Sequence, residues 1–297
     1  MTPPPDILCI GSVLWDIIGR SASAMRQGSD VPGRIARGPG GVALNIALTL
    51  LRFGLRPALL SAVGRDAPGE ELLALCASRG IDISHVWRSS ELPTDQYMAI
   101  EGANGLIAAI ADAHSLEAAG DRILAPLRDG TLGRPTHPHA GPIALDGNLT
   151  TALLTQIAHD PAFSAADLRV APASPGKAER LLPFLQIGRG ILYGNLEEAG
   201  ILCGRPFASA ADAGSALCDR GAARAIVTNG AEAAADAGPD GVLTGQPPPV
   251  LVTRVTGAGD TFMAAHIAAE TRGADRATAL DRALQAAATH ISGDIAT

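Results

Sequence analysis

The sequence predicts an α/β protein: a three-layer, doubly wound and mostly parallel sheet with a small β-sheet lid. From Pro142 onward, short aliphatic runs alternate with helical stretches, as strands and helices do in βαβ units. Earlier in the chain, two β-like runs flank Gly102–Gly105, which is a hairpin signal outside that alternation. We therefore expect one domain over residues 1–297, with a lid formed by about 16–38 and 93–113.

Composition and charge favour a globular protein with a small-molecule ligand. Of 297 residues, 47% are hydrophobic and 18% are charged, so the chain can bury a substantial core. A net charge of −7 without a long basic run gives no electrostatic footprint for nucleic acid or an anionic membrane. The four cysteines are scattered, and no signal peptide or membrane span is indicated. We expect a cytoplasmic protein.

Hydrophobic periodicity and glycine punctuation place the elements of the first half of the chain. These are a strand at 7–10, a helix from the glycines at 40–41 to Gly54, a strand at 58–64, a helix at 68–80, and hairpin strands at 96–101 and 106–110. Between Asp16 and Gly40 the sequence is polar and irregular, with short β-like pieces near Ile17 and at Arg34–Ala36.

The second half alternates steadily between the two element types. Strands are expected at 142–146, 168–171, 190–193, 224–228 and 249–255, helices at 150–158, 176–186, 208–221 and twice after Asp260, and surface loops at 133–142 and 238–249. Ligands of an open α/β sheet bind at the carboxyl ends of its strands. Polar residues follow the expected strands at Asp16, 146–148, 193–198, 228–230 and 256–260, and they should line one crevice.

The turn Thr256–Asp260 is the candidate centre of the chemistry. Thr-Gly-Ala-Gly between an expected strand and a helix leaves the first helical N–H groups open to an anion, above all a phosphate. Gly257 and Gly259 allow a ligand to approach the backbone closely. Asp260 suits two roles from this stretch alone. It is a helix cap, or it is a general base that takes a proton from an attacking hydroxyl.

Two familiar nucleotide motifs are excluded. The chain has no G-x-x-x-x-G-K-[ST] sequence, and Gly11 after the first strand is not followed by the spaced glycines of a dinucleotide fingerprint. If the protein binds ATP, it does so through a different motif.

Two signatures nevertheless resemble a known family. The run Gly40-Gly41-x-Ala43-x-Asn45-x-Ala47 and the later run Thr256–Asp260 are similar to the first and second signatures of the ribokinase-like (PfkB) carbohydrate and nucleoside kinases. Between them, Asn195-x-x-Glu198 resembles that family's metal and phosphate motif, and Thr228-Asn229-Gly230 resembles its Thr-x-Gly nucleotide motif. The resemblance covers nearly the whole chain and implies a ribokinase-like fold.

The resemblance implies a role for each matching residue. Asp260 is the base, and Gly257, Ala258 and Gly259 hold the transferring phosphoryl group as an anion hole. The ATP site draws on Asn195, Thr228, Gly230, Thr256, Gly257 and Gly259, and Mg²⁺ is organised by Glu198 and Asn195. The acceptor's hydroxyls bind Asp16, Gly41 and Asn45.

Within the family, other segments resemble the branch that phosphorylates pseudouridine. Thr94, Tyr97, Asn148 and Lys177 lie in the segments that match, and they are candidate acceptor-binding residues. Leu44, Ala171 and Gly194 depart from that branch. The predicted reaction is therefore transfer of the ATP γ-phosphate to the 5′-hydroxyl of pseudouridine, with ribose or another nucleoside as the alternative acceptor.

Other interpretations stay open. Asp16 could simply close a strand, Asn45 could be a buried helical amide, and Lys177 could be a solvated helix residue. The chain could also be a non-catalytic sugar or nucleoside sensor, although base and anion hole are both present. Lid sheets in the family often pair, which suggests a homodimer. Where K⁺-activated relatives carry Asp, this chain has Arg254, so we expect no K⁺ requirement.

Overall fold

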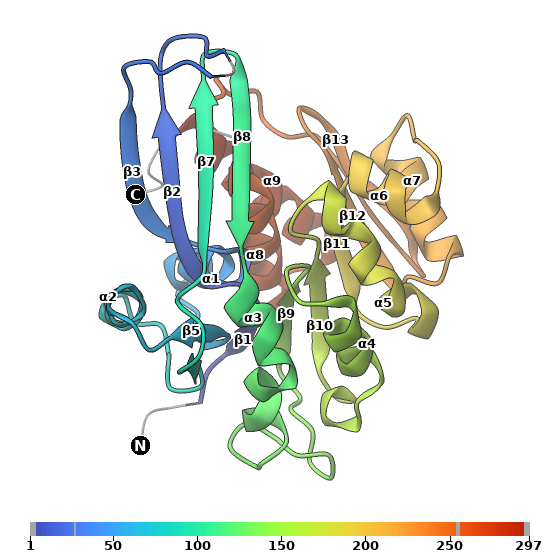
Figure 1. Ribbon diagram of the computed structural model, residues 1–297. Coiled ribbons are helices and arrows are strands. Elements are labelled where there is room, and N and C mark those ends of the chain that lie inside the picture. The colour runs from blue at the N-terminus through green and yellow to red at the C-terminus, as the bar shows by residue number, and fades with distance from the viewer. Residues whose placement is uncertain (1–3, 27, 254–255, 294–297) are drawn as a thin grey trace.

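The computed structural model describes residues 4–26, 28–253 and 256–293, and it confirms the predicted α/β class (Figure 1). Within these residues, eight strands form one sheet in the order β14-β13-β12-β11-β10-β9-β1-β4. Its parallel strands are β1 (Ile7–Ile10), β4 (Pro57–Leu60), β9 (Pro142–Asp146), β10 (Asp167–Ala171), β11 (Ile191–Asn195) and β12 (Arg224–Asn229). Their short aliphatic runs suit strands that are covered on both faces.

Two antiparallel strands extend this sheet at the β12 edge. They are β13 (Glu232–Gly238) and β14 (Gly241–Gly245), joined by a tight turn. The predicted surface loop at 238–249 is therefore wrong at 241–245, and the strand at 232–238 was not predicted. The sequence at 232–238 is rich in alanine, which has little strand propensity, and pairing with β12 and burial decide its conformation.

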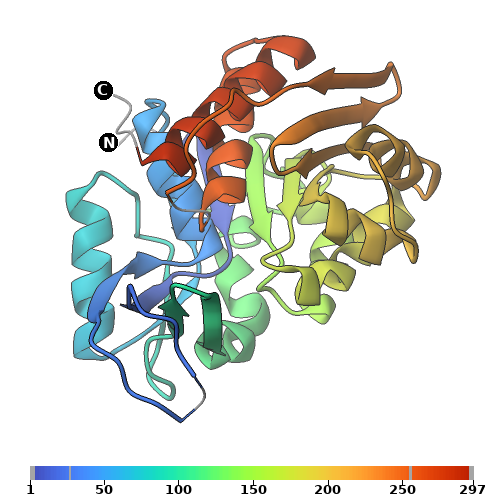
Figure 2. The same cartoon turned by 90° about the horizontal axis from the view of Figure 1, so that it is seen from above.

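Helices cover both faces of the sheet, as Figure 2 shows from above. One face carries α1 (Val42–Arg52), α8 (Ala258–Thr271) and α9 (Arg276–Ser292). The other carries α3 (His114–Ala119), η1 (Gly120–Leu127), α4 (Thr151–His159), η3 (Pro175–Leu181), α5 (Leu182–Ile187), α6 (Leu196–Cys203) and α7 (Ala210–Asp219). This arrangement gives the three predicted layers, with a separate hydrophobic core on each side of the sheet.

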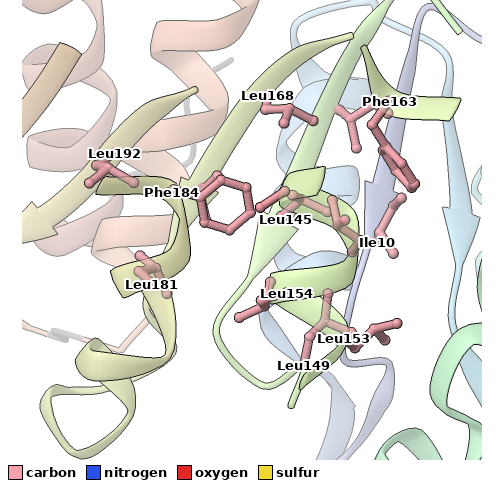
Figure 3. Packing of buried hydrophobic residues seen from close by; sticks show 14 of the residues in the cluster. Ile10, Leu145, Leu149, Leu153, Leu154, Phe163, Leu168, Leu181, Phe184 and Leu192 are labelled. Atoms are coloured by element: carbon pink, nitrogen blue, oxygen red, sulfur yellow. The ribbon is translucent and has the colours of Figure 1, made fainter. Parts of the chain in front are cut away.

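Aliphatic side chains fill most of the core under α4 and α5. Figure 3 shows Phe163 and Phe184 packed among the leucines and isoleucine of this face. Both phenylalanine side chains are fully buried. Because only 3% of the residues are aromatic, alanine and leucine supply most of the remaining contacts.

A second, four-stranded sheet rises from one end of the molecule (Figure 1). Its order is β3-β2-β7-β8, with β2 (Leu14–Arg20), β3 (Arg34–Gly40), β7 (Gln96–Gly102) and β8 (Gly105–Asp112). The predicted hairpin around Gly102–Gly105 is confirmed, and the β-like pieces near Ile17 and Arg34 belong to longer strands. This small sheet is attached where β1 ends and where α1 begins, next to the crevice expected from the sequence.

Two other strand predictions are wrong. The expected strand at 58–64 is two strands in different sheets: β4 joins the large sheet, and β5 (Ala62–Gly64) pairs with β6 (Trp87–Ser89). At Ser61 between them, the side chain donates to the carbonyl of Gly11. The strand expected at 249–255 is absent from its described part, 249–253. Three prolines at 247–249 have no N–H groups with which to continue pairing.

The remaining elements complete the frame. They are α2 (Ala67–Ser78), which ends before Gly80 as predicted, and η2 (Pro161–Phe163). In the described residues, no helix combines the length and apolarity needed to cross a membrane.

Candidate active site

The N-terminus of α8 presents a row of open backbone donors. Gly257 is the N-cap and has φ 83°, a left-handed conformation that glycine adopts without steric cost. The first intrahelical bond runs from the N–H of Thr261 to the carbonyl of Gly257, at 2.9 Å. The N–H groups of Ala258, Gly259 and Asp260 come before it, and they have no acceptor among the described residues. This is the geometry that binds an anion.

Asp260 lies in the first turn of α8 and is half-buried. Its Oδ2 accepts a hydrogen bond from Asn45 Nδ2 of α1, at 2.8 Å. Burial raises the pKa of Asp260 to about 7; the bond from Asn45 opposes this, and nearby carboxylates, Asp146 first among them, add to it. A carboxyl with a pKa near neutrality can accept a proton from a hydroxyl and later release it.

Asp16 reaches the same region from the small sheet. Its neighbour across the β2–β3 pair is Gly38, and across the β2–β7 pair it is Tyr97. A Cβ at Gly40 would overlap the carboxylate of Asp16, so the glycine makes room for it. Burial raises the pKa of Asp16 to about 6. Among the described residues its carboxylate has no hydrogen-bond partner, and so it remains free to accept one from a ligand.

A buried carboxylate ties together the loops that follow β1 and β9. Asp146 is fully buried, and its Oδ2 accepts from the backbone N–H of Ser12 at 2.7 Å, from the Ser12 hydroxyl at 2.9 Å and from the N–H of Ala43 at 3.1 Å. Its Oδ1 accepts from the N–H of Asn148 at 2.7 Å. Burial raises the pKa of Asp146, and these four donors oppose the shift by stabilising the ionised form.

Asn148 extends this cluster toward η3. Its Nδ2 donates to the Ser12 hydroxyl at 2.8 Å, and its Oδ1 accepts from Lys177 Nζ at 2.6 Å. Burial, and then the charge of Arg180, lower the pKa of Lys177. Both predicted acceptor residues are thus held together and half-buried, so Lys177 is not a freely solvated lysine.

Asn195 and Glu198 form a capping box at the start of α6. The Asn195 side chain accepts from the N–H of Glu198 at 2.9 Å, and Glu198 Oε2 accepts from the N–H of Asn195 at 2.8 Å. Burial raises the pKa of Glu198. Its other oxygen has no hydrogen bond within the described residues, so an oxygen donor suited to Mg²⁺ is available. In those residues, no group of three or more His, Cys, Asp or Glu side chains is placed to hold a metal by itself.

A wide cavity of about 730 Å³ opens beside this capping box. Asn195, Thr228 and Gly230, all predicted to meet the nucleotide, contribute to its wall. The loop after α6 also contributes to the wall, and there the guanidinium of Arg205 stacks on Phe207 at 4.4 Å from the ring centroid. The cavity has the size of a small-molecule site.

Two other predicted acceptor residues have contacts within the protein. Thr94 is 1% exposed, its hydroxyl donates to Asp66, and its N–H donates to the other oxygen of that carboxylate at 2.9 Å. Gly41 has φ 98°, and a Cβ there would overlap the carbonyl of Ser12. Thr94 therefore supports the turn before α2, and Gly41 allows α1 to start close to β1.

The sequence predictions placed Asp146 among the residues that line the crevice but gave it no role, and they did not name Ser12 or His290. His290 of α9 donates from Nε2 to the carbonyl of Thr256 at 2.8 Å, at the edge of the anion-binding turn. An Asp at the end of a strand followed by Gly-Asn was the only sequence signal for Asp146. His290 has no comparable signal, because a histidine in the last turn of a helix is common. Arg254 lies outside the described residues.

Comparison with known proteins agrees with this geometry. The family model described as "pfkB family carbohydrate kinase" matches residues 4–294. The chain is 27% identical over 100 residues to a pseudouridine kinase of Arabidopsis thaliana, and 33% identical over 107 residues to a pseudouridine kinase of Escherichia coli. These alignments span 34% and 36% of this chain, and they cover only 26% and 34% of the two relatives.

A solved structure is similar over far more of the chain. The carbohydrate kinase from Agrobacterium tumefaciens superposes with a TM-score of 0.81 and 26% identity, covering 98% of this chain and 92% of its own. Its fold, the family match and the open N-terminus of α8 lead to one assignment. The chain belongs to the pfkB family of carbohydrate kinases.

Proposed function

We propose that this protein is an ATP-dependent kinase that phosphorylates the 5′-hydroxyl of pseudouridine. The observation that carries the proposal is the pairing of Asp260 with Asn45 beside the open N–H groups of α8. This arrangement places a candidate base and a group of open N–H donors for an anion together in the first turn of α8. The family match over residues 4–294 supports one kinase domain, and the partial similarity to two pseudouridine kinases supports the acceptor.

In the proposed reaction, Asp260 accepts the proton of the acceptor hydroxyl. The hydroxyl oxygen forms a bond to the γ-phosphorus of ATP, and the bond from that phosphorus to the bridging oxygen breaks, so that ADP leaves. The N–H groups of Ala258, Gly259 and Asp260 stabilise the charge on the phosphoryl oxygens. The general-base role of Asp260 is preferred to simple capping because its carboxylate binds Asn45 of α1 and caps no helix N–H.

The acceptor pocket we propose lies between the small sheet and the ends of β1 and β9. Asp16 has a free carboxylate for ribosyl hydroxyls, and Tyr97 lies next to it on the neighbouring strand. Asn148 and Lys177 provide amide and ammonium groups for the carbonyls of a base. We assign the small sheet, about 16–38 and 93–113, as a lid that excludes water during transfer.

For the nucleotide we propose the cavity beside α6, with Asn195, Thr228 and Gly230 toward the phosphates. Glu198 fits Mg²⁺, because only one of its carboxylate oxygens accepts a hydrogen bond among the described residues and the other is available as a ligand. Water and phosphate oxygens would complete the coordination shell. The ion would supply charge neutralisation for the phosphoryl group.

Two further properties belong to this proposal. The outer face of the lid exposes Ile35, Met98, Ile100 and Ile110, which supports a homodimer formed through the two lids. All four cysteines are free, which supports a cytoplasmic location.

Release of ADP in the presence of Mg²⁺ and ATP tests the reaction. Pseudouridine, uridine, ribose and a hexose are compared as acceptors, and the product is identified by mass and by the position of its phosphate. We expect the highest kcat/KM with pseudouridine. Efficient phosphorylation of ribose without any phosphorylation of pseudouridine would contradict the acceptor assignment. Binding of a sugar or nucleoside without turnover would indicate a sensor.

A further inference from the structure

The loop that leads to the anion-binding turn is not held by the sheet. Residues 249–253 form no strand, and Val250, Leu251 and Val252 are 39%, 82% and 61% exposed. Support comes instead from the last turn of α9. Both the N–H and the hydroxyl of Thr253 donate to the carbonyl of Ile291, each at 2.9 Å.

His290 makes the contact nearest to the turn itself. Its Nε2 lies 2.8 Å from the carbonyl oxygen of Thr256. A carbonyl can only accept, so Nε2 must carry the proton, as it does in one neutral tautomer and in the imidazolium ion. The imidazole also lies against Gly257: a Cβ at Gly257 would come within 3.2 Å of Nε2. The ring therefore has a hydrogen bond with the turn and lies close to Gly257.

This contact sets the direction of a backbone donor. In a planar trans peptide, the carbonyl of Thr256 and the N–H of Gly257 point in opposite directions. Because the carbonyl points toward His290, the N–H of Gly257 points away from α9. That N–H has no acceptor within the described residues, as is true of the three that follow it. Donation to the carbonyl also polarises the peptide and makes its N–H a stronger donor.

We infer that His290 is a positioning residue, whose Nε2–H orients the Thr256–Gly257 peptide so that the Gly257 N–H joins the anion hole for the transferring phosphoryl group. The inference rests on the proposed function. His290 touches neither reactant; it acts through the turn. Since both of its protonation states that carry Nε2–H make the same bond, the support does not depend on the charge of the ring.

The test replaces His290 with one side chain that lacks an N–H donor and with another that keeps one. His290→Phe keeps a ring and removes the donor, and His290→Gln keeps an N–H donor at a similar distance. Thr289→Ala, one residue earlier in α9, is the matched control. For each variant we measure kcat, both KM values, the melting temperature and, by calorimetry, the affinity for β,γ-methylene-ATP with Mg²⁺.

We expect His290→Phe to lower the affinity for the analogue and kcat by about tenfold each, the usual effect of losing a residue that orients a ligand-binding group. The KM for the acceptor should stay within about twofold of the wild-type value. His290→Gln should recover to within about threefold of wild type, and Thr289→Ala should match wild type. If His290→Phe melts early, His290→Met replaces it, since it differs from the glutamine variant chiefly in lacking the donor. Equal values for donor-free and donor-bearing variants would overturn the inference.

The analogue separates the inference from the proposed function. If wild type binds the analogue and phosphorylates no acceptor, the reaction is wrong, and the affinity differences still decide the role of His290. If wild type does not bind the analogue, the nucleotide site and the positioning role both fail.

Discussion

Burial is the main reason that the pKa of Asp260 is raised, and nearby negative charge adds to this shift. Asp146, Asp16 and Glu198 all raise its pKa in addition to burial, while Asn45 holds its Oδ2. Protonation of a carboxylate in such surroundings is favoured, because it removes a buried negative charge. The carboxyl therefore combines a fixed position with a pKa suited to a general base near neutral pH.

Replacing Asp260 with Asn should lower kcat by about 10² to 10⁴, the usual contribution of a positioned base. The amide preserves size and a hydrogen bond to Asn45 but cannot take the proton. Steady-state kinetics at saturating substrates measures the effect, with ATP KM as an internal comparison. A variant that retains a third of the wild-type kcat would show that Asp260 has no role as a base.

The pH dependence of the reaction follows from the pKa of Asp260, about 7 in the folded protein. Only the ionised form accepts a proton, so kcat/KM should rise with pH through about 7 and then level off. Stability should move in the opposite direction. The unfolded carboxyl ionises near 3.8, so the folded state binds the extra proton between these values and loses stability as pH rises through them.

Measuring the melting temperature of wild type and Asp260→Asn at pH 5 and pH 8 checks this sign. The melting temperature of the variant relative to that of wild type should be higher at pH 8 than at pH 5, by about 2 °C or more, because the variant has no charge to bury. An acid limb centred near pH 4 in kcat/KM, or an unchanged stability difference, would contradict the raised pKa.

At the residue scale, the sequence predicted those site residues that lie within a short motif. Asp260, Asn45 and Glu198 were named from such motifs. The contact between Ser12 and Asp146 was not predicted, because these residues are 134 positions apart and meet only after β1 and β9 have paired. Thr94 was also named from such a segment, and its hydroxyl donates to Asp66.

The capping box of α6 allows a metal role to be separated from a helix-stabilising role. Glutamine at position 198 can still close a capping box, but it has no charge for Mg²⁺. We expect Glu198→Gln to keep its melting temperature within about 2 °C and to raise the Mg²⁺ concentration for half-maximal rate by about tenfold. Kinetic titration with Mg²⁺ at fixed ATP measures this.

An unchanged Mg²⁺ requirement in Glu198→Gln would leave Glu198 as a cap only. Asp219→Asn is the control, because Asp219 is exposed at the end of α7 and does not line the cavity beside α6. It should behave as wild type in both measurements.

The lid should close when acceptor binds. Its strands β2 and β7 carry Asp16 and Tyr97, so contacts with the acceptor tie the sheet to the main body. We expect amide hydrogen exchange to slow at 102–105 and around Gly33, with the turn at 238–241 unchanged as the internal control. Equal exchange with and without acceptor in both lid segments would contradict closure.

At the element scale, periodicity predicted most of the large sheet and its helices. It failed where tertiary pairing overrode local preference. The apolar run at 58–64 is divided between two sheets at Ser61, and the alanine-rich segment at 232–238 forms a strand because β12 lies beside it. The β-branched residues at 250–253 have no strand partner at all. Propensity measures suitability for a sheet, and it does not supply the neighbouring strand.

Across the whole molecule, buried ion pairs join the large sheet to α8 and α9. Glu270 of α8 accepts from Arg169 of β10 and from Arg224 of β12, the latter at 2.6 Å. Asp236 of β13, which is fully buried, pairs with Arg224 at 2.5 Å and with Arg276 of α9 at 3.0 Å. Although burial opposes it, these arginines lower the pKa of Asp236, and His266 with Arg169 does the same for Glu270.

Removing the charge of Glu270 should destabilise the fold by about 3 kcal/mol, because two arginines with little exposed surface lose a shared carboxylate. Urea unfolding of Glu270→Gln measures the loss, and Asp281→Asn, an exposed position on α9, is the control. A loss below about 1 kcal/mol would mean that the remaining carboxylates compensate.

The attachment of the small sheet has an evolutionary consequence. Asp16 and Tyr97 come from its strands, whereas Asn45 and Asp260 come from helices packed against the large sheet. Under the proposed roles, mutations in β2, β3, β7 and β8 would alter which acceptor fits, while the proposed base Asp260, its partner Asn45 and the turn at 256–260 keep their geometry. On that proposal, a lineage with this architecture would acquire a new acceptor without first losing its chemistry, because the two groups of residues lie on separate elements.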